Sequence, residues 1–250
     1  MIVLCFTSIP LTPNLIGLIA GDHNEPETVS FLRFLASQNS LSLIDIGGCL
    51  GEIAIPVSTV ESITKVYVFE PLPELCSIIS VNIALNNLSS KVSLHPLAVS
   101  STNGKVDMLI PKVATGTVVT SENCSFPPTP LHDNVVTVDS TTLDSFFDNS
   151  VIDGCLVILV DVEGHELSVI KGASRLIAQC QPFVIFEYNH VSKQSFTIDQ
   201  MIALMGPSYS FYRLRSDGFL DFDIEEAWNC VAVPEILKAT VFPMLLYPPS

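Results

Sequence analysis

Asp45, Gly47 and Gly51 form a D-x-G-x-x-x-G pattern that follows an apolar run beginning at Leu43. The run predicts a buried parallel strand. The glycines, with Gly48 between them, predict a tight turn, because residues without a Cβ tolerate positive φ and let a ligand approach the backbone closely. In open α/β sheets nucleotides bind at such turns, outside the carboxyl ends of the strands. An acid at the strand end repels a pyrophosphate but suits the ammonium group of a methionine-like ligand. The pattern therefore favours binding of S-adenosylmethionine.

A nicotinamide dinucleotide is the competing ligand for a glycine turn after a strand. Its G-x-G-x-x-G fingerprint would require glycines at positions 45 and 50, where this chain has Asp45 and Leu50. An oxidoreductase is therefore the weaker interpretation, and binding of NADH measured by fluorescence would revive it.

A second acid stands where the ribose of an adenosine would need one. Residues 65–70 predict another buried strand that ends in Glu70, with Pro71 directly after it. An acid at the end of the second strand of a βαβ unit is placed to accept bonds from both ribose hydroxyls; the alternative is an exposed strand-end carboxylate. The adenine ring is expected against the backbone of Ala98 and Val99, at the end of the third predicted strand.

Three side chains are candidates for the catalytic group if such a cofactor transfers its methyl group, which needs in-line alignment of the acceptor and removal of one proton. Asp161 ends a very apolar, central strand, and is expected to bind the methionine ammonium, to face the acceptor, or to cap the following helix. His165 titrates in a suitable range, but it falls in the first turn of a helix, where a surface histidine is common. His190 follows Glu187 at the next strand end and is the preferred base.

A metal site is a further alternative at the same strand ends. Asp161, Glu163 and Glu187 could hold magnesium, as in methyltransferases that orient catechol-like acceptors. Their spacing shows no compact set of oxygen ligands, so we predict no metal.

The composition is that of one large domain with reduced cysteines. The 250 residues can bury a substantial core and show no repeat or boundary, so we expect a single domain over residues 1–250. Only 15% of residues are charged, which predicts an apolar surface or a face buried in a homo-oligomer. The net charge of −15 argues against nucleic acid as a partner. Seven cysteines, never in C-x-x-C spacing, favour free thiols.

Targeting and membrane-spanning segments are not expected. Residues 1–21 are apolar but carry no Lys or Arg, and Pro10 and Pro13 interrupt them, which argues against a signal peptide. A spanning helix needs about 18 consecutive apolar residues, and no uninterrupted stretch of that kind exists. These features predict a cytoplasmic protein.

The elements that must position the candidate residues alternate between strands and helices. They predict a doubly wound, mostly parallel seven-stranded sheet flanked by helices, with strands over residues 43–46, 65–70, 92–100, 155–161, 182–190, 208–214 and 229–233. Helices are expected over residues 24–38, 52–63 and 75–85, from 162 through 179, and over 196–205. Residues 1–40 are expected to cover the domain, either as a lid over the cofactor or as plain core cover. Residues 104–112 predict an added hairpin, 135–138 another strand, and 113–134 a Thr/Ser/Pro-rich loop on the substrate side.

Several strings follow one another as they do in the FkbM-type family of class I S-adenosylmethionine-dependent methyltransferases. They are Glu25-Pro26-Glu27-Thr28, Asp45-Ile46-Gly47-x-x-x-Gly51, Phe69-Glu70-Pro71, Asn82 with Asn86, Thr142-Leu143-Asp144 and Asp161-Val162-Glu163-Gly164-His165-Glu166 with Lys171-Gly172-Ala173. The chain resembles this family over most of residues 22–234. The resemblance implies a Rossmann-like fold, S-adenosyl-L-methionine as cofactor, and O-methylation of a small-molecule or carbohydrate hydroxyl.

Two positions depart from the family's pattern. Cys49 stands where a G-A-N-x-G turn has an amide able to bond the cofactor, and Leu159 stands where a lysine is common. A catalytically degenerate cofactor-binding module of the same fold is therefore the second hypothesis. The sequence does not specify the methyl acceptor.

Overall fold

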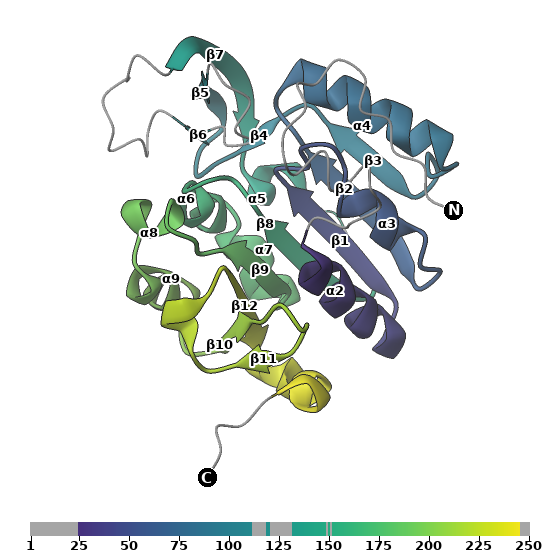
Figure 1. The fold of residues 1–250 in the computed structure, drawn as a ribbon, viewed down its shortest axis with the longest axis vertical. Coiled ribbons are helices and arrows are strands. Elements are labelled where there is room, and N and C mark those ends of the chain that lie inside the picture. The colour runs from purple at the N-terminus through teal and green to yellow at the C-terminus, as the bar shows by residue number, and fades with distance from the viewer. Residues whose placement is uncertain (1–24, 112–118, 121–131, 149, 151, 246–250) are drawn as a thin grey trace.

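An eight-stranded sheet forms the centre of the protein (Figure 1). The computed structural model describes residues 25–111, 119–120, 132–148, 150 and 152–245. The strands of the main sheet are β1 (Leu41–Ile46), β2 (Ile63–Phe69), β3 (Val92–His95), β8 (Cys155–Val160), β9 (Phe183–Glu187), β10 (Tyr209–Leu214), β11 (Leu220–Asp221) and β12 (Asn229–Pro234). Their spatial order is β11-β10-β12-β9-β8-β1-β2-β3. The five strands from β3 to β9 are parallel, whereas β12 is antiparallel to β9 and β10 is antiparallel to β12.

Helices cover both faces of this sheet and create two apolar cores, which confirms the predicted doubly wound architecture. The helices are α2 (Pro26–Gln38), α3 (Ala54–Ser58), α4 (Pro73–Leu85), α5 (Leu143–Phe146), α6 (Glu166–Lys171), α7 (Ser174–Cys180), α8 (Ser192–Ser195), α9 (Ile198–Met205) and α10 (Lys238–Val241), with 3-10 turns η1 (Ile224–Glu226), η2 (Glu235–Leu237) and η3 (Phe242–Met244). One core joins the sheet to α2, α3, α4 and α10. The other joins it to α5, α6, α7 and α9.

Strand alternation puts three acids on one side of the sheet at its carboxyl edge. The residues two positions before them, Leu43, Leu159 and Ile185, all pack into the core beneath α2, α3 and α4. Because alternate residues of a strand face the same side, Asp45, Asp161 and Glu187 share this face. The strands therefore bring together acids that lie far apart in sequence.

A second, four-stranded sheet starts where β3 ends. Its strands are β4 (Ala98–Val99), β5 (Gly104–Pro111), β6 (Val119–Thr120) and β7 (His132–Thr141), in the order β4-β7-β5-β6. Figure 1 shows it at the top of the view, beside the main sheet. The hairpin predicted over 104–112 is instead a single strand, β5, which pairs with β7, and the strand predicted over 135–138 lies within β7. Most of the predicted loop over 113–134 lies outside the described residues, as do residues 1–24 of the predicted N-terminal cover.

Three predicted elements end earlier than the sequence pattern indicates. The helix expected over 52–63 is limited to α3, where Pro56 lacks an amide hydrogen and the hydroxyls of Ser58 and Thr59 bond backbone carbonyls. The strand expected over 92–100 stops before Pro96, and Ala98–Val99 instead pairs with β7. The helix expected through residue 179 is divided at Gly172 and Ala173 into α6 and α7, and Gly172 is packed so closely that a Cβ there would lie 2.1 Å from the carbonyl oxygen of Ser100.

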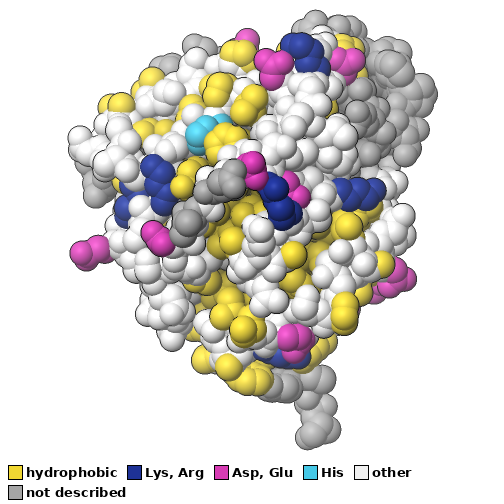
Figure 2. All heavy atoms as spheres, turned by 180° about the vertical axis from the view of Figure 1, so that it is seen from behind, with side chains coloured by type: hydrophobic (Ala, Val, Ile, Leu, Met, Phe, Trp, Pro, Cys, Tyr) yellow, Lys and Arg dark blue, Asp and Glu magenta, His cyan; other side chains and the backbone are white. Residues whose placement is uncertain are grey.

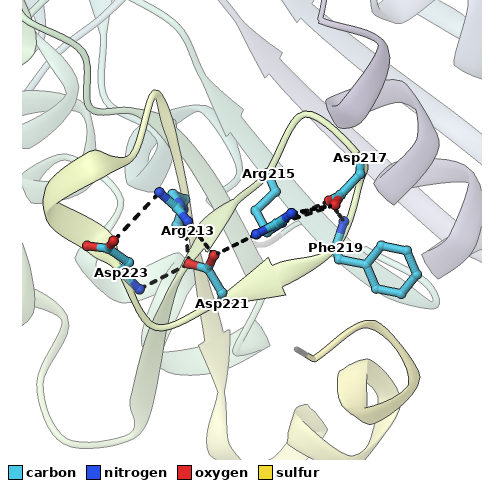
Figure 3. A network of polar contacts seen from close by, with 6 residues as sticks. All are labelled: Arg213, Arg215, Asp217, Phe219, Asp221 and Asp223. Atoms are coloured by element: carbon cyan, nitrogen blue, oxygen red, sulfur yellow. Dashed lines mark hydrogen bonds and ion pairs between the residues drawn. The ribbon is translucent and has the colours of Figure 1, made fainter. Parts of the chain in front are cut away.

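The β10–β11 hairpin carries a chain of ion pairs at the carboxyl edge of the sheet (Figure 3). Arg213 contacts Asp221 at 2.5 Å, and Arg215 contacts Asp217 at 2.7 Å and Asp221 at 3.5 Å. Leu214 pairs with Asn229, which in turn pairs with Glu187, so the hairpin lies on the same edge as the strand-end acids. Both arginines are thus already neutralised by neighbours within the hairpin.

The surface is apolar for a protein with this net charge. Figure 2 shows several patches of hydrophobic side chains between scattered charged ones on the face opposite that of Figure 1. Large hydrophobic side chains that remain exposed include Phe222, Trp228, Ile236 and Phe242. Within the part of the chain that the structure describes, none of the helices is both long enough and apolar enough to cross a membrane.

Candidate active site

The glycine turn after β1 is built around close backbone approach. Gly47 has a φ of +90°, and a Cβ there would lie 1.9 Å from the carbonyl oxygen of Asp161 at the end of β8. The amides of Gly47 and Gly48 both donate to the carbonyl of Phe69, at 2.9 and 3.1 Å. Gly51 also has a positive φ, of +80°. The turn is therefore locked between the ends of β2 and β8, and the positive φ values at Gly47 and Gly51 agree with the tight turn predicted from the sequence.

Glu70 holds this turn from the end of β2. Its Oε2 accepts from the amide of Cys49 at 3.0 Å, and its Oε1 accepts from the amide of Leu72 at 2.9 Å. Cys49 is in the left-handed region with a φ of +46°, so the bond to Glu70 fixes a conformation that non-glycine residues disfavour. Glu70 is buried rather than an exposed strand-end acid, and desolvation raises its pKa to about 7. Pro71, predicted beside the cofactor, is half-buried next to it.

A small pocket opens beside the glycine turn and is rich in carboxylates. It is lined by Glu25, Asp45, Gly47, Gly48, Cys49, Glu52, Ile53, Leu159 and Asp161. None of these lining residues is a lysine or arginine. Burial, followed by the charges of Glu52, Glu25 and Glu70, raises the pKa of Asp45 to about 7. The pocket is therefore suited to a positively charged ligand, which would relieve repulsion between these acids.

The N-terminus of α2 contributes one of these carboxylates. Glu25 precedes the helix with a φ of +48° and accepts a bond from the hydroxyl of Thr28 at 2.8 Å. The side-chain amide of Asn229, at the start of β12, donates to the same carboxylate at 2.8 Å. Helix α2 thus packs into the core through Phe31 and Leu32 and also supplies part of the pocket wall.

Asp161 and Glu187 form a buried pair of acids on adjacent strands. A side-chain hydrogen bond between them lowers the pKa of Glu187, but desolvation and the charges of Glu163 and Glu166 outweigh it and raise that pKa to about 8. Burial and the charge of Glu187 also hold the pKa of Asp161 well above its ordinary range. The side-chain amide of Asn189 donates to Oε1 of Glu187 at 2.5 Å.

The structure separates the two candidate histidines. His165 is only 2% exposed, and its Nε2 lies 2.9 Å from the hydroxyl of Ser100. Burial lowers its pKa to about 4, so the ring is neutral near pH 7, and the expectation of a surface histidine is wrong. His190 is exposed beyond β9, with its ring 6.2 Å from that of Trp228. One candidate histidine is therefore enclosed in the protein, and the other is open to solvent.

The positions predicted for the adenine ring belong to the small sheet. Ala98 and Val99 are buried in β4 and pair with Ser140 and Thr141 of β7. Val99 packs into the core under α5 and α6, whereas Ala98 packs with residues of β5 and β7. They follow the end of β3, but Pro96 redirects the chain, so they are not a continuation of that strand.

The fold brings three acids to this region that the sequence pattern does not assign to the cofactor site. Glu25 is recognisable as part of a helix start and of one string shared with the FkbM-type family. Glu187 is recognisable only as a strand-end residue before His190 and as a member of the metal alternative. Glu52, whose Oε2 accepts from the amide of Leu50 at 3.0 Å, gives no signal beyond its place directly after Gly51. In the described ranges, no group of three or more His, Cys, Asp and Glu side chains is arranged to hold a metal ion.

The protein is expected to become less stable as pH rises through the range where these acids ionise. The folded-state pKa values of Asp45, Glu70 and Glu166 are raised to about 7, and that of Glu187 to about 8. The folded state therefore binds more protons than the unfolded state between about pH 4.5 and pH 8, and the free energy of unfolding falls with rising pH in that window. We expect a loss of at least about 3 kcal/mol between pH 5.5 and 8, since one pKa unit on one group corresponds to about 1.4 kcal/mol.

Urea unfolding at four pH values across this window measures that loss. Asp45→Asn should make the dependence on pH shallower, because it removes one of the titrating groups. A free energy of unfolding that rises from pH 5.5 to 8 would show that these carboxylates are ionised without cost in the folded protein.

Comparisons with known proteins agree with this architecture. The Methyltransferase FkbM domain family matches residues 45–220. Among solved structures, methyltransferase FkbM from Methylobacillus flagellatus KT is similar with a TM-score of 0.50 and 18% identity, over 76% of this chain and 42% of that chain. The chain therefore spans less than half the length of that relative.

Two other solved structures align at lower scores. The O-methyltransferase from Bacillus cereus in complex with SAH has a TM-score of 0.47 and 15% identity, over 91% of this chain and 93% of that chain. The precorrin-6y C5,15-methyltransferase from Geobacter metallireducens GS-15 has a TM-score of 0.44 and 11% identity, over 83% and 85%. No curated protein matches the sequence. The family match covers the glycine turn, Glu70 and Asp161 in one continuous range. The chain therefore belongs to the FkbM family of class I methyltransferases.

Proposed function

We propose that this protein is an S-adenosylmethionine-dependent O-methyltransferase that acts on a hydroxyl of a small molecule or carbohydrate. The observation that carries the proposal is the carboxylate-lined pocket beside the glycine turn, whose described lining residues include no lysine or arginine. S-Adenosylmethionine carries an ammonium and a sulfonium, so it suits a pocket whose acids repel one another. The diphosphate of a nicotinamide dinucleotide does not, because it would add negative charge to the same space.

The residues present fit this cofactor. Asp45 would hold the ammonium, and the turn formed by Gly47, Gly48 and Gly51 would lie against the methionine moiety, with Gly47 and Gly48 lining the pocket. Each oxygen of Glu70 accepts one backbone amide and keeps further acceptor capacity, so the ribose hydroxyls could add to the existing bonds. Ala98 and Val99 remain the proposed neighbours of the adenine ring.

The chemistry divides between the cofactor and the protein. When bound, S-adenosylmethionine supplies the electrophilic methyl group. The protein has to align the acceptor hydroxyl with that group, exclude water and take up one proton. Asp161 lines the pocket and stands at the carboxyl edge, where it can meet an acceptor. His190 lies exposed outside the pocket lining, and His165 is enclosed with Ser100, so neither histidine is as well placed as Asp161.

Calorimetric titration with S-adenosylmethionine, S-adenosylhomocysteine and NADH tests the cofactor. We expect micromolar affinity for the first, weaker affinity for the thioether because it lacks the sulfonium charge, and no binding of NADH. An acceptor screen that begins with methyl glycosides then tests for O-methylation. Tight NADH binding with no binding of S-adenosylmethionine would overturn the proposal.

A cofactor-binding module without turnover is the second candidate, and it is motivated by one lining residue. Leu159 is 2% exposed and forms part of the pocket wall, where the family commonly has a lysine. Its side chain can neither donate a hydrogen bond nor neutralise Asp161. Cofactor binding without cofactor consumption across a broad acceptor panel would favour this candidate.

A further inference from the structure

The paired acids at the ends of β8 and β9 have a geometry that the cofactor site alone does not explain. Val160 of β8 is in register with Phe186 of β9, so Asp161 and Glu187 follow each other across neighbouring strands. Alternation places both side chains on the α2 face of the sheet. Asp161 lines the pocket, whereas Glu187 is 5% exposed and stands behind it.

One carboxylate oxygen of Glu187 accepts a hydrogen bond, and the other has no donor among the described residues. Its Oε1 accepts from the side-chain amide of Asn189 at 2.5 Å, and the carbonyl oxygen of that amide caps the backbone amides of Val191 and Ser192 at 2.7 and 3.1 Å. Its Oε2 is buried and accepts no hydrogen bond from the described residues. A buried carboxylate oxygen without a donor is costly, so this atom points to a proton or ligand that completes the site.

A group able to complete it is the other acid of the pair, whose side chain is in hydrogen-bonding contact with that of Glu187. Two carboxylates in hydrogen-bonding contact cannot donate to each other, and the contact between Asp161 and Glu187 becomes favourable only when one of them is protonated. The remaining charged neighbours are all acids: Glu25 on α2 and Glu163 and Glu166 in the segment between β8 and α6. None of them can supply a positive charge to replace the proton.

We propose that Asp161 and Glu187 share one proton, that a cation bound in the pocket expels it, and that the emptied pair then accepts the proton of the methyl acceptor. This inference rests on the proposed function. In the transfer step the acceptor oxygen forms a bond to the methyl carbon. The carbon–sulfur bond breaks with its electron pair on sulfur, and the hydroxyl proton passes to Asp161. The proton taken from the acceptor is then the one that the pair shares, so the starting protonation state is regenerated when product leaves. Glu187 is a positioning residue, which stores charge behind Asp161.

The shared proton is tested first in the protein alone. With ¹³C-labelled Asp and Glu side chains, the Asp161 and Glu187 carboxyl carbons should both titrate well above ordinary carboxyl groups. Glu187→Gln should lower the Asp161 midpoint by at least about one pH unit, since it removes the coupled charge that raises it. An Asp161 midpoint that Glu187→Gln leaves unchanged would overturn the sharing of a proton. Exposed Glu226 provides a control, because Glu226→Gln should alter neither carbon.

The expulsion of the proton is tested by binding rather than turnover. Calorimetry with S-adenosylmethionine at pH 7, in two buffers of different ionisation enthalpy, counts the protons released. Wild type should release about one proton through the pair, and Glu187→Gln should release fewer by about that amount while still binding, since one of two coupled acids is gone. Equal release by both proteins would overturn the proposal.

The two hypotheses fail in different ways. Absence of S-adenosylmethionine binding to folded wild type refutes the proposed function, and the carbon titration still decides whether the proton is shared. If wild type and Glu187→Gln both bind S-adenosylmethionine and release equal numbers of protons, only the proposed sharing and expulsion of a proton by the acid pair is refuted. If Glu187→Gln does not fold, the same calorimetric comparison is made with Asp161→Asn, which should also release about one proton fewer than wild type.

Discussion

Gly47→Ala is expected to abolish cofactor binding and to destabilise the fold more than any other single change at the site. The new Cβ would lie 1.9 Å from the carbonyl oxygen of Asp161, and the residue would remain at a φ of +90°. Backbone strain of this kind costs about 1–3 kcal/mol, and overpacking adds about 1–3 kcal/mol. We therefore expect a loss of about 4 kcal/mol in the free energy of unfolding, which corresponds to roughly 10 °C in Tm for a domain of this size.

Gly206→Ala is the matched control for this substitution. Gly206 has a similar φ of +77°, but a Cβ added there would meet no atom within 4 Å, so it reports the strain without the clash. The difference between the two variants in urea unfolding isolates the close approach of β1 and β8. Equal destabilisation by both would show that the turn relaxes easily and that Asp161 moves aside.

Removal of the Glu70 carboxylate is expected to weaken S-adenosylmethionine binding about 100-fold, since two hydrogen bonds to a charged group are each worth about 1.5–3 kcal/mol. The loss has two sources. Glu70 holds the amide of Cys49, and with it the shape of the glycine turn, and it is the proposed acceptor for the ribose hydroxyls. Glu70→Ala removes both, whereas Glu70→Gln keeps one acceptor oxygen and should lose less affinity.

A cofactor analogue without the 2′-hydroxyl separates the two sources. If Glu70 binds the ribose, wild type should bind the 2′-deoxy analogue more weakly than S-adenosylmethionine, and Glu70→Ala should bind both alike. The control is Glu74→Ala, which changes an exposed acid in the first turn of α4. Undiminished discrimination between the two ligands in Glu70→Ala would refute the ribose assignment and leave the turn-holding role.

The parts of the site that were predictable from sequence depend on local rules. The glycine turn follows from positions that need positive φ, and the strand-end acids follow from the alternation of apolar strands and helices. These rules place Asp45, Glu70 and Asp161 at one edge before any long-range contact is known. They also predict the doubly wound sheet, because each strand is apolar enough to be buried on both faces.

The features that escaped prediction depend on contacts between distant segments. His165 occupies a helix start that is typical of a surface residue, yet the small sheet brings Ser100 against it and buries the ring. The same segment also approaches Gly172 so closely that a side chain there would clash with the carbonyl oxygen of Ser100. The sequence places Asp161 and Glu187 at the same edge as possible metal ligands, but their direct contact and the burial of Glu187 depend on strand order, which sequence periodicity does not encode.

The position of Trp228 gives the protein a built-in optical probe. It is the only tryptophan in the chain, it is 55% exposed, and its carbonyl accepts the amide of Tyr188 one residue beyond Glu187. All indole emission therefore originates at the carboxyl edge of β9, next to His190. Changes at the acid pair can be followed there in the unlabelled protein, without background from any other tryptophan.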